Sequence, residues 1–414
     1  MKKVAAIILT VILLFSTYGQ PVQVDTYAAT QYVKVEAFIK NLVTGLDISI
    51  DKNENDPYLK AAYNTGILKS GDFTEYTGYL TRTDAAVLIN RADEYLYRNT
   101  VEEKLLKIVL TKRISDIGKV PAGKREDVAK CFAKGLIVGY SNGYYIQNRE
   151  FRGSGKVSTG TAKTLIGLVL HPKDRAPVSP DGMLIRTTNL PKNADKYDYI
   201  LACYPNKFYE RKFEFMFTDQ YIAGERDPRF EVYPVDMKNT TFKTWIDEWP
   251  FSEEMDKYLY DWAATAETYL KYLFNVDYRT VDENWIKGLA SCFVKSNIDE
   301  AEAIRNYYIK HIKANKVVVE SSIIAVEPST LYDDGDYCMR AYVRYRIIAD
   351  DINVKQNRLL YCSYPALNNL KSGVWREGIF DIRFGSNDGY GGDGAYWAID
   401  FLSNFIDAYN VPVE

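Results

Sequence analysis

The residues best suited to chemistry lie at Thr81-Arg82-Thr83-Asp84, directly before an apolar helical pattern. Thr81 and Asp84 have the spacing of a capping box, which predicts that a helix begins here. Apolar residues then recur at steps of three and four as far as Leu96, so one helix face should be buried. Arg82 falls in the first turn, where the helix dipole disfavours a cation. Two interpretations follow: a solvated surface arginine, or an anion receptor in which the guanidinium and the helix N–H groups bind one ligand.

Similar patterns recur on both sides of this helix and indicate an internal repeat. Two short amphipathic helices are each predicted to end at a glycine, Gly66 or Gly135, that is followed by two apolar residues. Each leads through a polar loop into a longer helix, and one further longer helix precedes them. Three like helices are therefore expected, separated by two complete helix-loop-helix units. The short helices fall within 56–73 and 125–145, and the longer ones within 32–46, 79–96 and 157–170.

The order of these motifs resembles a set of S-layer homology repeats. The matching phrases are LTRTD at 80–84, ISDI at 114–117 and GLIVGYSNGYY at 135–145. The resemblance covers residues 29–172, in units at 32–50, 56–98 and 113–171. It implies a pseudo-threefold all-α module that binds acidic, pyruvylated secondary polymer on peptidoglycan, with Arg82 as the motif arginine. The positions that it implies for polymer binding are Arg82, Thr81, Asp84, Lys34, Asp116, Gly139 and Tyr140.

Two departures from the family pattern suggest a weakened anchor. At the start of the first longer helix Lys34 replaces the arginine, and no threonine caps the helix before Glu36. In the third, Ser158 can cap but Thr159 stands where the arginine should be. Lysine offers a point charge without a bidentate fork, and threonine offers no charge. We expect one good pocket, one poor pocket and one lost pocket; the alternative is a fold retained as a spacer.

The first residues predict export from the cell. Met1-Lys2-Lys3 precede the apolar run at 4–15, and small residues follow at Ala28 and Ala29. This pattern is typical of a signal peptide, expected at 1–28, and the run is too short for a stable membrane span. The expected location is therefore secreted, at the cell wall or S-layer of a Gram-positive bacterium. No integral membrane segment is expected after cleavage.

Composition excludes several classes of function. The formal net charge of -3 argues against nucleic acid as a partner. The sequence has five cysteines, widely spaced and odd in number, which fit neither a disulfide framework nor a zinc cluster. With two histidines in the sequence, a histidine-based triad and the H-E-x-x-H zinc motif are excluded. We therefore assign no catalytic residue, no metal site and no cofactor.

The second half of the chain predicts an α+β domain. Residues 173–195 contain three prolines and little periodicity, and are interpreted as a linker. The domain is expected at 196–414, with 252–414 its best-defined part. Helices followed by antiparallel strands suggest a bent sheet wrapped around helices. This order resembles the cone of NTF2-like (cystatin-like) proteins, and two phrases resemble uncharacterised Gram-positive surface proteins. Helices are expected at 252–274, near Trp285 and at 296–312, and strands at 316–328, 336–350, 358–365 and 374–384, with a turn at 333–336.

The second of these strands carries a candidate anion-binding face. Alternation predicts that Met339, Ala341, Val343, Tyr345 and Ile347 point one way and the intervening residues the other. Three guanidinium groups and a phenol on one face could bind a sugar acid or a peptide carboxylate. The alternative is a face that is solvated or covered by local acids. The residues of this candidate face are Arg340, Tyr342, Arg344 and Arg346.

The sequence thus predicts a multidomain fold, an all-α S-layer-homology-like repeat module followed by an α+β domain. The favoured function is that of a non-catalytic surface protein, anchored non-covalently to acidic wall polymer and displaying a domain whose own ligand is unknown. The alternative is a wall-polysaccharide hydrolase with a carboxylate pair in the C-terminal half. A third hypothesis is a structural surface component that self-associates.

Overall fold

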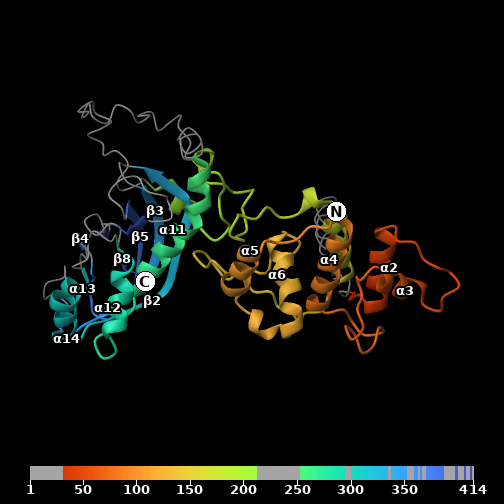
Figure 1. Cartoon of the computed structure of the whole chain (residues 1–414), viewed down its shortest axis with the longest axis horizontal. Helices are drawn as coiled ribbons and strands as arrows, with labels where there is room; N and C mark the ends of the chain where they lie inside the picture. The colour runs from red at the N-terminus through yellow and green to blue at the C-terminus, as the bar shows by residue number, and fades with distance from the viewer. Residues whose placement is uncertain are drawn as a thin grey trace, which may run out of the picture.

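The computed structural model describes residues 31–211, 252–293, 300–333, 337–351, 359–361, 364–365, 370–386, 397–399, 405–406 and 411–412. The predicted signal peptide and most of the predicted turn at 333–336 lie outside these residues. The described chain is α+β: a helical part (residues 31–170), a connecting segment (171–211), and a sheet part formed by the described residues from 252 onwards (Figure 1).

The helical part contains three longer helices at the positions that the repeat predicted. Short helices lie between them, and the first of these ends at Gly66 with a φ of +77°. Helix α6 ends in the same way at Gly135, with a φ of +66°. Both glycines adopt the left-handed conformation that the pattern required. The elements are α2 (Val35–Gly45), α3 (Pro57–Asn64), α4 (Arg82–Tyr97), α5 (Glu103–Ile108), η1 (Val109–Arg113), η2 (Ile117–Lys119), η3 (Ala122–Lys124), α6 (Arg125–Ala133) and α7 (Thr159–Leu170).

A closed ring of three backbone hydrogen bonds joins the starts of the three longer helices. The N–H of Val33 donates to the carbonyl of Val157 at 2.9 Å, and that of Leu80 to Val33 at 2.9 Å. The N–H of Val157 completes the ring by donating to Leu80 at 3.0 Å. All three residues are buried, each one position before a helix N-cap. The ring therefore brings three equivalent helix ends together around a single core.

The connecting segment contains the predicted linker at 173–195 and the first residues of the predicted α+β domain, and it contacts both other parts. Asp181 forms a buried ion pair of 2.7 Å with Arg113 of the helical part. Further along, Leu201, Tyr204 and Phe208 are fully buried in a cluster that also contains residues of the sheet. Regular structure is sparse, as the prolines predicted, but side-chain burial fixes the path. Its short helices are η4 (Pro172–Asp174), η5 (Ala194–Lys196) and α8 (Asn206–Glu210).

The sheet part is an antiparallel sheet packed against helices. The strand order is β1-β2-β3-β5-β6, and β8 also pairs with β5. Helix α11 lies along the sheet and contacts β2 (Figure 1). The shorter helix α12 contacts α11. The elements are α11 (Ser252–Leu273), β1 (Val276–Asp277), α12 (Glu283–Ala290), α13 (Glu300–Ala303), η8 (Ile304–Ile309), α14 (Lys310–Ala314), β2 (Val318–Asp333), β3 (Tyr337–Ile348), β5 (Arg376–Ser386), β6 (Trp397–Ile399) and β8 (Val411–Pro412).

Alternation along β3 confirms the predicted inner face. Met339, Ala341, Val343, Tyr345 and Ile347 are all buried in the core between sheet and helices. Side chains at alternate positions of a strand point to the same face, so these five residues share one core. The other face of β3 is called the outer face below.

The strand predicted at 358–365 is wrong at three of its described residues, 359–361, which are not in a strand. Of the described residues in this range, β4 (Tyr364–Pro365) is regular, and it pairs in parallel with β7 (Phe405–Ile406) in a separate two-stranded sheet. Strand β3 instead pairs directly with β5. Leu359 and Leu360 are both buried in the core, although they are consecutive. A strand would send such neighbours to opposite faces, so packing against the core overrides strand propensity here.

Candidate anion-binding site at the start of helix α4

The first turn of α4 is capped by Thr81, as predicted. The N–H of Asp84 donates to the Thr81 hydroxyl oxygen at 3.2 Å, and this hydroxyl donates to the Asp84 carboxylate at 2.6 Å. The other carboxylate oxygen accepts from the Lys124 ammonium at 2.6 Å. Asp84 therefore binds the threonine side chain and a lysine, and not the threonine N–H as a reciprocal capping box requires. Both residues stabilise the helix start and are engaged within the protein.

The backbone N–H groups of this turn are also engaged, which corrects the idea that they share a ligand with Arg82. The N–H of Arg82 donates to the carbonyl of Gly155 at 2.8 Å, and that of Thr83 to Gly153 at 3.0 Å. The chain before α7 thus satisfies the donors that a helix start usually leaves open. An anion at this site would bind through side chains.

The guanidinium of Arg82 lies on aromatic rings and makes no ion pair with a described residue. Its central carbon is 5.0 Å from the centre of the Tyr140 ring and 5.6 Å from that of Phe151. Its Nε is buried and lacks a hydrogen-bond partner, and the described residues offer this guanidinium no ion pair. Burial lowers the pKa of Arg82, although an arginine stays charged at neutral pH. A half-buried cation that makes no ion pair in the described residues has the chemistry to accept an external anion.

A second guanidinium lies on the same tyrosine. Arg152 lies 4.3 Å from the centre of the Tyr140 ring, and its Nε donates to Glu150 at 2.8 Å. Tyr140 is held by a backbone pair with Glu150 and follows Gly139, whose φ is +64°. A Cβ on Gly139 would come within 3.0 Å of Phe132 and the Glu150 carbonyl, so only glycine allows this approach.

Asp116 positions this arrangement and is not placed to bind a ligand directly. One of its carboxylate oxygens accepts from the N–H of Phe151 at 2.6 Å, and the other from the N–H of Arg152 at 2.8 Å. Both oxygens are therefore engaged by the loop that carries two of the residues around Arg82. The ligand-contacting role implied for Asp116 is corrected to a positioning role.

The equivalent ends of α2 and α7 differ from α4. Lys34 is exposed, and α2 has no side-chain cap, as predicted. The cation that lies on aromatic rings there is Lys156, with its ammonium 4.7 Å from Tyr79 and 5.8 Å from Tyr32. Sequence inspection missed Lys156 because it belongs to the loop before α7, on the neighbouring repeat. Pairing of residues 81 and 156 across the ring brings it to this place.

The third helix start carries no cation on its motif position. Ser158 caps α7 by accepting from the N–H of Thr161 at 3.1 Å, which confirms the predicted cap. Thr159 directs both its N–H and its hydroxyl to the carbonyl of Gln31, at 2.9 and 3.2 Å. The residue in the arginine position is thus engaged by the start of the helical part.

The candidate face on β3 is wrong for two of its four residues. Arg340 is fully buried, and its Nε donates to Asp381 at 2.9 Å while Nη1 donates to the carbonyls of Phe208 and Arg211. Tyr342 is also buried under the connecting segment. Its ring stacks on Tyr145 with a centroid distance of 3.5 Å. These two residues are not accessible to a ligand, whereas Arg344 and Arg346 are partly exposed.

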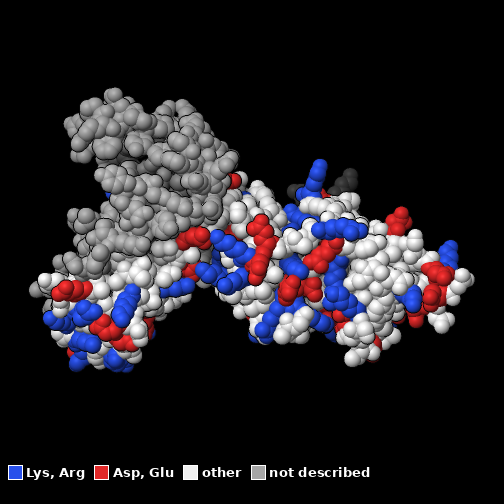
Figure 2. Space-filling model, in the orientation of Figure 1, with Lys and Arg blue, Asp and Glu red and all other residues white. Residues whose placement is uncertain are grey.

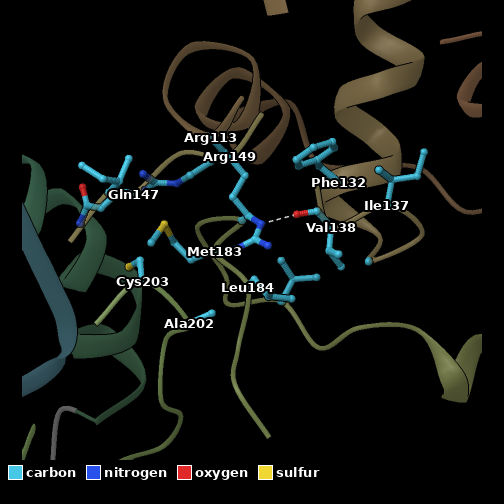
Figure 3. A pocket seen from close by; sticks show the side chains of 14 residues that line it. Arg113, Phe132, Ile137, Val138, Gln147, Arg149, Met183, Leu184, Ala202 and Cys203 are labelled. Atoms are coloured by element: carbon cyan, nitrogen blue, oxygen red, sulfur yellow. Dashed lines mark hydrogen bonds between the residues drawn. The ribbon is translucent and has the colours of Figure 1, made fainter. Parts of the chain in front are cut away.

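A cavity between the helical part and the connecting segment is too small for a ligand. Figure 3 shows Phe132 and Val138 on one side and Met183, Leu184 and Cys203 on the other. The cavity volume is about 30 Å³, which is room for water alone. The side chain of Arg149 crosses this region and donates to the carbonyl of Val138. We interpret this cavity as a packing feature.

The hydrolase with a carboxylate pair stays a prediction, and four of the described acids are buried. Asp93, Asp181 and Asp381 are buried in ion pairs with basic residues. Glu327 is fully buried, out of reach of a polymer. Within the described residues no three metal-ligating side chains of histidine, cysteine or acid gather, and no helix is long and apolar enough to cross a bilayer. The described free cysteines are Cys131, Cys203, Cys292 and Cys338, all buried.

The arrangement of Arg82, Tyr140, Phe151 and Arg152 is called the Arg82 site below. Its chemistry is that of a partly desolvated guanidinium on aromatic rings, open to an anion. Figure 2 shows basic and acidic groups interspersed over the visible face of the helical part. No protein-family model matches the chain, and no curated protein matches it.

Proposed function

We propose that the protein is a secreted, non-catalytic surface protein whose helical part anchors it to acidic polymer of the cell wall. The observation that carries this proposal is the Arg82 guanidinium, which is stacked on Tyr140 and Phe151 with a buried Nε that lacks a partner. Three like helices with their starts joined in a ring fit the S-layer homology resemblance of the sequence. The helical part would act as the anchor, and the sheet part would be displayed.

The charge of the Arg82 site suits a singly charged group. Arg152 is paired with Glu150, so this pair contributes no net charge. Arg82 makes no ion pair within the described residues, so its guanidinium can bind one anionic group, although the Asp116 carboxylate is near enough to raise its pKa. A carboxylate, such as that of a pyruvate ketal on a sugar, matches both this charge and the flat fork of a guanidinium. The exposed ring of Tyr140 offers an apolar surface beside it for the sugar.

The other two helix starts favour a weaker anchor than three complete sites would give. The α2 end offers Lys156 and Lys34, which act as point charges, and the α7 end offers Thr159. Linked sites multiply the apparent affinity, so the loss of one site lowers it steeply. We propose that the Arg82 site provides most of the binding, and the lysine site a smaller part.

The sheet part is proposed to be an NTF2-like cone that displays a binding surface of its own. Helix α11 and the inner face of a curled antiparallel sheet share one core, which agrees with such a cone.

The test is co-sedimentation of the purified chain with peptidoglycan sacculi, before and after acid treatment that strips the secondary polymer. Arg82→Gln keeps a polar, unbranched side chain and removes its charge. We expect binding to untreated sacculi to fall by about tenfold or more, since loss of one charge-assisted contact costs about 1.5–3 kcal/mol. Stripped sacculi should retain neither protein.

Arg98→Gln is the matched control, because Arg98 is exposed at the opposite end of the same helix. This variant should bind like the wild type. Equal binding of Arg82→Gln and wild type, or undiminished binding to stripped sacculi, would contradict the anchor and favour a spacer role for the helical part.

A further inference from the structure

The outer face of the sheet is divided into a covered half and an open half. The covered half lies under the connecting segment and contains Tyr342 and the buried pair of Arg340 with Asp381. The open half contains Arg344, Arg346 and Trp375, which are all partly exposed. Three arginines at alternate positions of one strand therefore share a face but have different surroundings.

The acids near the open half, Glu320 and Glu377, bind residues other than Arg344. Glu320 accepts from Arg346 at 2.6 Å. Glu377 lies opposite Arg344 in the strand register of β3 and β5. Its carboxylate accepts from the Tyr342 hydroxyl at 2.8 Å and lies 3.7 Å from the Lys207 ammonium. Arg344 makes no ion pair and its guanidinium donates no hydrogen bond within the described residues, and its Nε is buried.

An aromatic platform holds this unpaired cation in place. The guanidinium carbons of Arg344 and Arg346 lie 5.3 and 5.0 Å from the Trp375 ring centre, respectively. Stacking restricts the long side chain of Arg344, so a ligand that binds it loses less conformational entropy. Beside Arg344 on the next strand lies Ile323, so an apolar side chain adjoins the cation.

We propose that Arg344 and Trp375 form a binding site for a small molecule that carries one carboxylate group. The local charge decides between anions. Arg346 is compensated by Glu320 and Glu377 by Lys207, so Arg344 contributes one net positive charge. A carboxylate matches that charge and the planar fork of the guanidinium, whereas a doubly charged phosphate would stay half uncompensated and close to two acids. Sugar acids are the class that we test.

The experiment is calorimetric titration of the purified chain with glucuronate, in an Arg82→Gln background so that the Arg82 site does not contribute. For one charge-assisted contact we expect a dissociation constant on the order of 1 mM. Arg344→Gln should weaken binding by about tenfold, which corresponds to about 1.4 kcal/mol. Arg344→Lys keeps the charge but loses the fork, and should weaken it by a smaller factor.

Arg346→Gln is the matched control on the same strand and the same tryptophan. It should change affinity by less than about threefold, because Glu320 already holds this arginine. Glucose, which lacks the carboxylate, should not bind, and inorganic phosphate should bind more weakly than glucuronate. Thermal melting of each variant verifies the fold. Absent binding of glucuronate, equal affinity in Arg344→Gln, or tighter binding of phosphate would overturn the assignment.

Discussion

The start of helix α4 and the covered half of the outer sheet face each contain a buried or half-buried arginine, but the two arginines have different partners. Arg82 is half-buried on aromatic rings and makes no ion pair within the described residues. Arg340 is completely buried and pairs with Asp381, which lies 41 residues further along the chain. The first arginine is available to a ligand, and the second stabilises the fold. Which role an arginine takes depends on the acid that the fold brings to it.

The largest expected effect is on the covered arginine. Arg340→Ala leaves the Asp381 carboxylate buried without its cation, so the free energy of unfolding should fall by about 3–5 kcal/mol. Urea unfolding of the full chain measures this loss. The double variant Arg340→Met with Asp381→Leu removes both charges and should be less destabilised than Arg340→Ala. A loss in Arg340→Ala of less than about 1 kcal/mol, as at an exposed pair, would remove the contrast with Arg82.

The next effect concerns the acid of the covered half and depends on pH. Burial raises the pKa of Glu327 well above its usual value, and Asp181 raises it further, while a hydrogen bond from Ser329 and the charge of Arg113 oppose this. The unfolded chain therefore releases this proton at lower pH than the folded chain, and stability falls as pH rises above about 4.3.

Glu327→Gln keeps the neutral form at every pH and should abolish that part of the decline. The variant should gain in melting temperature relative to the wild type between pH 5 and 8, with the smallest difference at pH 4. Melting curves across this range measure the gain. A difference in melting temperature that is constant with pH would indicate that the pKa of Glu327 is the same in the folded and unfolded states.

A smaller effect compares the helix starts with one another. Thr81→Ala removes the side-chain cap of α4 and should cost about 1 kcal/mol of unfolding free energy, as should Ser158→Ala at α7. Lys34→Ala should leave stability nearly unchanged, because the Lys34 side chain does not cap α2. Urea unfolding ranks the three variants. Equal losses in all three would mean that the caps are not what distinguishes these ends.

The smallest effect is on the open half of the sheet. The ion pair of Arg346 and Glu320 is partly exposed, with 34% and 43% of the two side chains accessible. Arg346→Ala should therefore lower the free energy of unfolding by no more than about 1 kcal/mol. Urea unfolding compares this loss of free energy with the loss in Arg340→Ala. A loss as large as that of Arg340→Ala would show that exposure does not separate the two halves.

Local patterns in the sequence predicted the elements well. Thr81 and Ser158 cap their helices, Gly66 and Gly135 end theirs with positive φ, and β3 buries the alternate residues that were expected. Each of these features depends on interactions within a few residues. Such interactions are visible as spacing in the sequence.

The contacts between distant residues were not visible in this way. Carbonyls of the loop before α7 occupy the N–H groups of α4, and Lys156 lies on aromatic rings of two other repeats. The predicted strand at 358–365 failed at residues 359–361 because packing of Leu359 and Leu360 against the core replaced strand pairing. A periodic pattern does not record which segment will supply the partner.

The sequence by itself determined which residues carry charge and on which side of a helix or strand they project. That information follows from residue type and from the 3.6- and 2-residue periods. Only the tertiary structure decided that Asp381 neutralises Arg340, that Asp116 holds the loop beside Arg82, and that Arg344 makes no ion pair within the described residues. The physical reason is that electrostatic and hydrogen-bond energies depend on distance and burial in space, and these are set by long-range packing.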